Sequence, residues 1–180
     1  EDIAYMRSIP NMTVICPADA NETVEAVKAI AEYEGPCYLR LNRNDYNNVT
    51  VEGKKFEIGV PTVLKEGNQV AVFATGYMTG IALEAAYELE GTISAKVINV
   101  STLKPFNEKL IIEMSESCRG IIGGLGGAVS QALCKACKPI EFVGINDTFG
   151  CSAHSYKDVL AYHGLTKEHV IDAIKKMAAI

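Results

Sequence analysis

The chain has 180 residues, of which 48% are apolar and 22% are charged. This composition is ordinary for a globular protein, and the length allows one domain or one small domain plus part of another. The formal net charge of -5, without any basic run, argues against a nucleic-acid partner. No apolar run reaches the roughly 20 residues of a membrane helix, and no secretion signal is recognisable, so we expect a cytoplasmic protein that is not membrane-bound.

The sequence contains six cysteines, which we expect to be free thiols because this is not a small cysteine-dense secreted scaffold. Cys134 and Cys137 form a CxxC motif, a spacing found in zinc sites. The motif lies within an apolar helical pattern, without a second CxxC or a nearby histidine. We therefore expect no metal site.

The first 50 residues predict a strand, a helix and a second strand. Apolar runs at 11–16 and 36–42 are typical of short buried strands. Between them, Asp19 and Glu22 have the spacing of a capping box, which predicts a helix over residues 20–34.

This predicted helix has an apolar side and a charged side. Val24, Val27 and Ala31 share one face, whereas Glu25 and Lys28 lie elsewhere on the helix. We expect the apolar face to pack on the core and the charged residues to meet solvent.

The composition changes after the second strand. Asparagine, glycine, lysine and proline are frequent between residues 43 and 67, where no long apolar helix face occurs. Weak alternation at 49–53 and 55–67 is compatible with short strands. We interpret residues 51–66 as a linker.

Residues 67–180 alternate strands with helices. The expected strands cover 70–74, 95–100 and 140–146, and the expected helices cover 78–89, 107–117, 128–137, 155–164 and 166–180. Asn107 and Thr166 are expected helix caps. The order predicts right-handed crossovers and an α/β fold of three layers, in which helices cover both faces of a mainly parallel, mixed sheet.

The alternation fails before the helix at 128–137. Two helices follow each other there, and Ile121 and Ile122 are too few for a strand of about five residues. We therefore expect a strand to be missing near residues 118–120, and we favour the omission of a segment at that point.

A glycine-rich turn precedes the same helix. Gly123, Gly124, Gly126 and Gly127 leave little side chain there, so the backbone can pack closely or present its amides to an anion. A dinucleotide fingerprint would need a third glycine where Val129 stands, which argues against a nicotinamide cofactor.

Seven blocks occur along the chain in the order MRSIPNMTVICPADANET, YLRLNR, FATGYM, STLKPFN, IIGGLGGAV, DTFG and YHGLTKEHVIDAIKKM. Together they resemble the transketolase family, most closely the C-terminal section of split transketolases. The resemblance implies that residues 1–50 are the remnant of a pyrimidine-binding domain. It also implies that residues 67–180, after the linker 51–66, are the transketolase C-terminal domain.

The resemblance implies a parent enzyme that transfers a two-carbon ketol unit between sugar phosphates with thiamine diphosphate and Mg²⁺. The family's cofactor-activating carboxylate, its stacking aromatic residue and its metal-binding Gly-Asp-Gly are absent from this sequence. The resemblance therefore implies that this chain contains no catalytic, cofactor-binding or metal-binding residue. We expect the isolated chain to be inactive and to serve in assembly, with the N-terminal pyrophosphate-domain section and a second copy as partners.

Other interpretations remain open. The chain could come from 1-deoxyxylulose-5-phosphate synthase or from the beta subunit of a 2-oxo acid dehydrogenase, which share the C-terminal domain. A non-enzymatic dimerisation or ligand-binding module is the alternative outside the enzymes. Sequence upstream of Glu1 would discriminate among the enzymes.

One substrate contact is implied by the block YLRLNR. By its resemblance to the family, Arg43 binds the phosphate of a sugar-phosphate substrate, and Arg40 is the weaker candidate. A guanidinium suits this role because its planar fork donates two hydrogen bonds to phosphate oxygens.

The three histidines, His154, His163 and His169, fall in the implied C-terminal domain, which lies away from the cofactor in the family. We expect surface or interface packing for them. Ser152 and Ser155 lack the glycine-flanked elbow of a hydrolase nucleophile, so the sequence does not support a catalytic triad.

Overall fold

A computed structural model describes residues 2–43, 46–123, 126–134 and 138–180. Its main sheet has five strands in the order β3-β5-β4-β7-β8. The strands are β3 (Thr62–Lys65), β4 (Val70–Ala74), β5 (Ala95–Asn99), β7 (Gly120–Gly123) and β8 (Ile140–Phe142). β3 runs antiparallel to β5 and the other neighbours are parallel, so the predicted mixed, mainly parallel sheet is confirmed.

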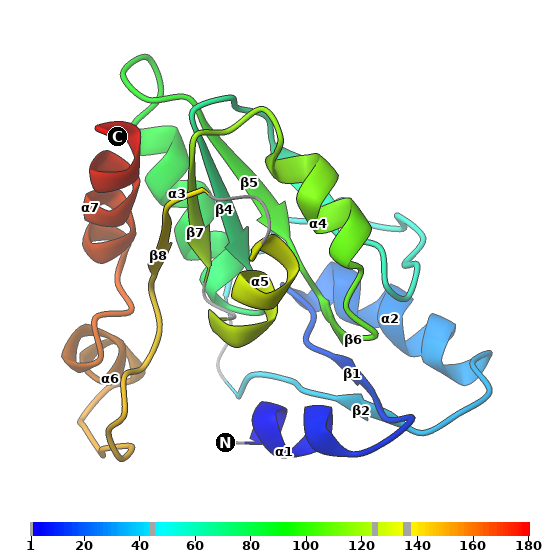
Figure 1. Cartoon of the computed structure of the whole chain (residues 1–180). Coiled ribbons are helices and arrows are strands. Elements are labelled where there is room, and N and C mark those ends of the chain that lie inside the picture. Colours follow the sequence, from blue (N-terminus) through cyan, green and yellow to red (C-terminus); the bar gives the residue numbers. More distant parts are fainter. Residues whose placement is uncertain (1, 44–45, 124–125, 135–137) are drawn as a thin grey trace.

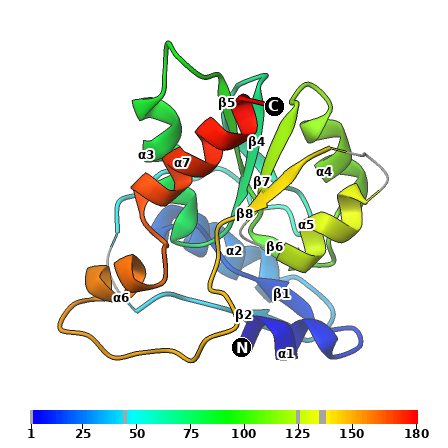
Figure 2. The same ribbon diagram turned by 60° about the vertical axis from the view of Figure 1, so that its left-hand side comes forward.

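Helices cover both faces of this sheet (Figures 1 and 2). One face packs against α3 (Met78–Glu88) and α7 (Lys167–Ala178), and the other against α4 (Glu108–Ser115) and α5 (Gly126–Leu133). Side chains alternate along the central strand β4, since Val70 and Val72 belong to the first core and Ala71 and Phe73 to the second. The predicted three-layer α/β fold is thus confirmed.

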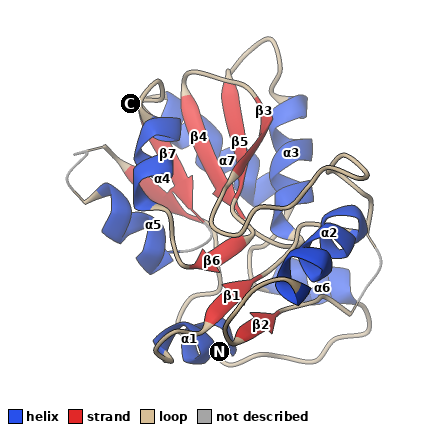
Figure 3. Ribbon diagram, turned by 90° about the vertical axis from the view of Figure 1, so that its right-hand side faces the viewer, coloured by secondary structure: helices blue, strands red, loops and turns tan. Residues whose placement is uncertain are grey.

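A second, three-stranded sheet has the order β2-β1-β6 (Figure 3). Its parallel strands β1 (Thr13–Ile15) and β2 (Cys37–Leu39) match two predicted strands. β6 (Thr102–Lys104) was not predicted, and it pairs antiparallel with β1 although it follows β5 of the main sheet. The two halves of the chain therefore share a sheet.

The smaller sheet is flanked by α1 (Asp2–Ser8), a helix that was not predicted, and by α2 (Ala20–Ala31). The remaining helix is α6 (Tyr156–Tyr162), and it lies within the helix predicted over residues 155–164. Thr166 stands at the N-cap position of α7, but its side chain makes no cap hydrogen bond. Its hydroxyl lies 2.9 Å from His169 Nδ1 instead.

The structure has a strand where we expected one to be missing near 118–120, so that expectation is wrong, whereas the expected omission of a segment at that point stays a prediction. Residues Gly120–Gly123 form β7, which pairs in parallel with both β4 and β8. A four-residue strand suffices because its neighbours have only three to five residues. At its start, a Cβ on Gly120 would lie 2.7 Å from Met177 Cβ, so the missing side chain lets α7 approach the strand.

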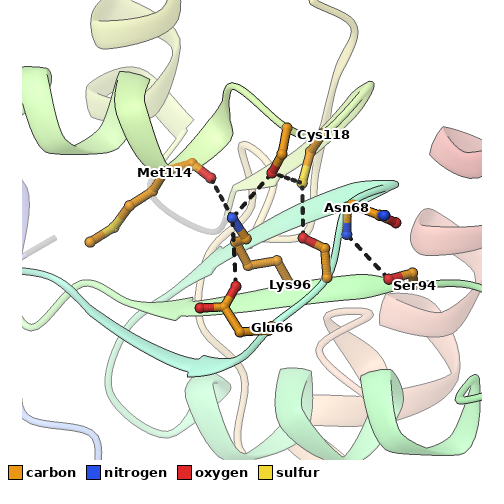
Figure 4. A network of polar contacts seen from close by, with 8 residues as sticks. Glu66, Asn68, Ser94, Lys96, Met114 and Cys118 are labelled. Carbon is orange, nitrogen blue, oxygen red and sulfur yellow. Dashed lines mark hydrogen bonds and ion pairs between the residues drawn. The ribbon is translucent and has the colours of Figure 1, made fainter.

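The link from α4 into β7 is held by two lysines. Lys96 Nζ on β5 donates to the carbonyl oxygen of Met114 at 3.3 Å and to Ser117 Oγ at 3.2 Å (Figure 4). Lys138 Nζ donates to the carbonyl oxygen of Ser115 at 2.6 Å. Both ammonium groups satisfy carbonyl groups at the C-terminal end of α4, where the helix dipole favours positive charge.

The predicted orientation of α2 is also wrong. Val24 and Val27 are 54% and 49% exposed, whereas Ala26 is fully buried and Ile30 packs beside it. Glu22, Ala26 and Ile30 follow one another at intervals of four residues and share a face. Because the Glu22 carboxylate is bonded inside the molecule, this face turns inward and the valines turn out.

Candidate functional site

The segment that follows β2 carries both arginines of the predicted phosphate site. Arg40 is held by the first helix, since its Nε lies 3.4 Å from Asp2 Oδ2. Tyr38 Oη donates to the same oxygen at 2.8 Å. Burial alone would raise the pKa of Asp2, but the hydrogen bonds from Tyr38 and the Ile3 backbone and the charge of Arg40 lower it overall. Arg40 is therefore engaged in a structural ion pair.

Arg43 lies beyond the strand, and its side chain is exposed. Its backbone N–H donates to Asn42 Oδ1 at 2.8 Å, which fixes the main chain rather than the side chain. Among the residues that the structure describes, the Arg43 guanidinium makes no ion pair or hydrogen bond. It is thus available to a ligand, whereas its predicted role in phosphate binding stays a prediction.

Residues shortly after Arg43 line a pocket of about 530 Å³ between the first half of the chain, α3, α6 and the start of α7. Lys157 and Lys167 stand at this pocket together with Glu84 and Glu168. Because two cations are balanced by two carboxylates, the pocket does not select an anion by its net charge. Arg43 is the better candidate for a phosphate.

The predicted glycine turn joins β7 to α5. A Cβ on Gly123 would lie 3.3 Å from Val129 Cγ1, so this glycine permits close packing of the helix on the strand. Gly126 begins α5, and Gly127 is exposed, with nothing within 4 Å of the position that a Cβ would take there. Gly124 lies outside the described residues. The packing role is supported at Gly123, and anion binding by the turn stays a prediction.

Two acidic groups, the buried Asp19 and the half-buried Glu22, connect the halves of the molecule. Glu22 accepts hydrogen bonds from the Ala18 backbone at 2.7 Å, from Asn99 Nδ2 at 2.9 Å and from Ser101 Oγ at 2.8 Å. Asn99 ends β5 of the main sheet, so the helix of the first half is tied directly to the second half.

The neighbouring Asp19 fixes the segment after Arg43. As predicted, its Oδ1 accepts from the Glu22 backbone N–H and caps α2. The same carboxylate also accepts from the backbone N–H groups of Val49 and Thr50, both at 2.6 Å. The capping-box pattern identified one of these contacts, but the sequence held no sign of the others because Val49 and Thr50 lie 30 residues away.

The remaining candidate groups do not form a reactive site. Cys151 Sγ lies 3.7 Å from His163 Nε2 at the surface, and Ser155 caps α6 through Asp158. In the described part of the chain, no three His, Cys, Asp or Glu residues lie close enough to hold a metal ion. Cys137, half of the CxxC motif, falls outside that part. No described helix is long and apolar enough to cross a membrane.

Comparison with known proteins decides the family. The profile described as transketolase, C-terminal domain, matches residues 59–170, and that of the transketolase pyrimidine binding domain matches residues 1–49. The chain belongs to the transketolase family. The two profiles match in the order that the resemblance implied, with the pyrimidine-binding domain before the C-terminal domain. The exact domain boundaries stay predictions.

Individual members of the transketolase family are similar over almost the whole chain. A putative transketolase C-terminal section of Methanocaldococcus jannaschii is 39% identical, over 97% of this chain and 58% of the relative. A 1-deoxy-D-xylulose-5-phosphate synthase of Geobacillus sp. is 35% identical, over 97% of this chain and 30% of the relative. The solved structure of a split gene transketolase, described as an inactive beta4 tetramer, has a TM-score of 0.93 and 39% identity, over 99% of this chain and 62% of that one.

The chain therefore spans only part of its transketolase-family relatives. It covers 58%, 50% and 55% of three curated relatives, among them the Methanocaldococcus section. Family membership and fold follow directly from these matches. The activity of a whole enzyme needs a separate argument.

Proposed function

We propose that this chain is the C-terminal part of a ketol transferase of the transketolase type, whose parent moves a two-carbon ketol unit between sugar phosphates. Arg43 carries the proposal, because it is an exposed cation four residues after β2, the last strand of the part that matches the pyrimidine-binding domain. A guanidinium there can grip a substrate phosphate with two parallel hydrogen bonds. The chain is 39% identical in sequence to a putative transketolase C-terminal section, which supports the same function.

Thiamine diphosphate and Mg²⁺ are proposed as cofactors of the parent enzyme only. The described residues contain no cluster suited to a metal ion, so the residues present do not fit that group and we derive no step through it. The proposal assigns cofactor binding to other parts of the enzyme, including an N-terminal pyrophosphate-domain section. The isolated chain is then inactive, and the enzyme works in the cytoplasm.

Replacing Arg43 tests the phosphate contact. In the assembled enzyme, Arg43→Ala should raise the KM for a phosphorylated sugar about 30-fold, or about 2 kcal/mol, because a charge-assisted hydrogen-bond pair is lost. The kcat and the KM for an unphosphorylated ketol donor should stay within about twofold, since neither involves the phosphate. Steady-state kinetics with both substrates measure the difference.

Arg119→Ala is the matched control, because Arg119 is also exposed but precedes β7 near the opposite end of the strands. If Arg43→Ala left the KM for the phosphorylated sugar unchanged, Arg43 would not bind the substrate phosphate, and the proposed substrate would lose its support. If the assembled enzyme instead made 1-deoxy-D-xylulose 5-phosphate, the synthase alternative would replace ketol transfer.

We also propose that the chain associates with a second copy. β2 lies at the margin of the small sheet, and among the described strands only β1 pairs with it. An open strand edge offers backbone groups to another chain. The molar mass in sedimentation experiments should rise with concentration, and a monomer throughout the micromolar range would speak against association.

A further inference from the structure

Three tyrosine rings from separate parts of the chain meet beside the Arg43 segment. The Tyr46 and Tyr77 rings lie 5.3 Å apart between centroids at an angle of 84°. Tyr77 meets Tyr156 in the same way, at 5.5 Å and 74°. Both geometries are edge-to-face, an arrangement in which aromatic pairs attract each other beyond their apolar burial. Tyr77 is therefore the central ring of the cluster.

The tyrosine cluster contacts residues that precede and follow Arg43 in the chain. Before it in the chain, Asn42 Nδ2 donates to Tyr156 Oη at 3.3 Å. The Asn42 side chain also accepts from the Arg43 backbone N–H at 2.8 Å, so one amide joins the Tyr156 hydroxyl to the Arg43 main chain. After Arg43, Tyr46 packs on Tyr77. Both ends of the short arginine segment are thus attached to the second half of the molecule.

This attachment matters because the described residues 40–43 and 46–48 belong to no helix or strand. Arg43 follows β2 by four residues, and its exposed side chain makes no described contact that would orient it. Two parallel hydrogen bonds to a phosphate require the guanidinium to be held in a defined direction. The Arg43 main chain is held through its N–H by Asn42, and Tyr46, three residues further along the chain, is anchored on Tyr77.

The tyrosines also suit an anionic ligand. Burial raises the pKa of Tyr46 and of Tyr77, and nearby charged groups add to the rise in both. A tyrosine with an ordinary pKa of about 10 is already neutral at physiological pH, and a raised pKa leaves this unchanged. The two phenols can hold the segment without repelling a phosphate.

We propose that Tyr77 and Tyr156, both in the C-terminal half, are positioning residues that hold Arg43 for the substrate phosphate. This inference rests on the proposed function, since Arg43 must be the phosphate ligand for its orientation to affect binding. Neither tyrosine touches the substrate in this scheme. Their effect passes through Tyr46 and Asn42 to the arginine.

The test uses this chain with D-ribose 5-phosphate as the probe and NMR titration to measure its dissociation constant. Tyr77→Ala should weaken binding about fivefold, because both ring contacts are lost. Tyr77→Phe keeps the ring and should bind like the wild type. Tyr162→Ala, an exposed tyrosine on the same helix as Tyr156, is the matched control and should also leave binding unchanged.

A double substitution separates positioning from a general loss of structure. If Tyr77 acts through Arg43, adding Tyr77→Ala to Arg43→Ala should cause no further loss of affinity. Hydrogen exchange without ligand gives an independent readout. Backbone amides between residues 41 and 48 should exchange several-fold faster in Tyr77→Ala than in Tyr77→Phe, while amides of β4 and β5 keep their protection.

The outcomes for the two proposals are distinct. If Arg43→Ala leaves ribose 5-phosphate binding unchanged, the proposed function fails. If Arg43→Ala weakens binding while Tyr77→Ala does not, or if the exchange of residues 41–48 is unaltered, only the positioning role is overturned. Additive losses in the double variant would likewise overturn it, because they would mean that Tyr77 acts independently of Arg43.

Discussion

Replacing Asp19 by alanine should lower the free energy of unfolding by about 4 kcal/mol, because it removes a buried carboxylate and leaves several partly buried hydrogen-bond donors without their acceptor. Asp19 is only 1% exposed. Its carboxylate accepts four hydrogen bonds, from the Glu22 N–H, the Val49 N–H and both the N–H and the hydroxyl of Thr50. The substitution therefore removes the cap of α2 and releases the 49–50 segment together.

Urea unfolding followed by circular dichroism measures this change. Asp172→Ala on the exposed side of α7 is the matched control, and its effect should stay within about 0.5 kcal/mol. A loss of less than about 1 kcal/mol in Asp19→Ala would mean that water replaces the carboxylate at little cost. The central role given to this acid would then be incorrect.

The same carboxylate makes stability depend on pH. Burial alone would raise the pKa of Asp19, but hydrogen bonds from Glu22, Val49 and Thr50 outweigh it and lower the pKa below its usual value. A lowered folded-state pKa contributes stability above the unfolded value of about 3.9, and this contribution is lost as the pH falls through the folded pKa. Wild-type stability should thus fall more steeply below about pH 4 than that of Asp19→Ala.

Replacing Gly67 by alanine should cost about 3 kcal/mol, because the new methyl group has no room. A Cβ at this position would lie 2.4 Å from the Ala95 carbonyl carbon and 2.4 Å from the Lys96 nitrogen. These are backbone atoms at the start of β5, which pairs with strands on both sides and cannot move aside without breaking the sheet. The clash should appear in the midpoint of urea unfolding.

Gly127→Ala is the control for this glycine. Its Cβ would meet nothing within 4 Å, and it lies in α5, where alanine is favoured over glycine. We expect it to raise stability by up to about 1 kcal/mol. Equal effects at the two glycines would refute the packing argument at Gly67.

The parts of the fold that depend on local pattern could be predicted. Val70–Ala74 and Met78–Glu88 appear close to their expected bounds, since a fully apolar run and a helical repeat are visible within a few residues. β7 could not be recognised, because two isoleucines between glycines resemble a turn until their neighbours in the sheet are known. β6 is a three-residue strand whose partner, β1, lies almost 90 residues away.

The orientation of α2 shows a different limit. Hydrophobic spacing favoured burial of Val24 and Val27, but hydrogen bonds from Asn99 and Ser101 to the half-buried carboxylate of Glu22, on another face, determined which side turned inward. At the candidate site, the resemblance to the family pointed to Arg43 and, as the weaker candidate, to Arg40. Tyr77 and Tyr156 were not identified, because nothing in the sequence links residues that meet only after folding.

The central claim is that this chain supplies one part of a ketol transferase. The most direct measurement is ketol transfer, with thiamine diphosphate and Mg²⁺ supplied, by the chain alone and by a chimaera. In the chimaera, residues 1–180 replace the matching part of the Methanocaldococcus section, and a pyrophosphate-domain partner is present. We predict no turnover by the chain alone and turnover by the chimaera. Turnover by the chain alone, or a folded and assembled chimaera without turnover, would contradict the claim.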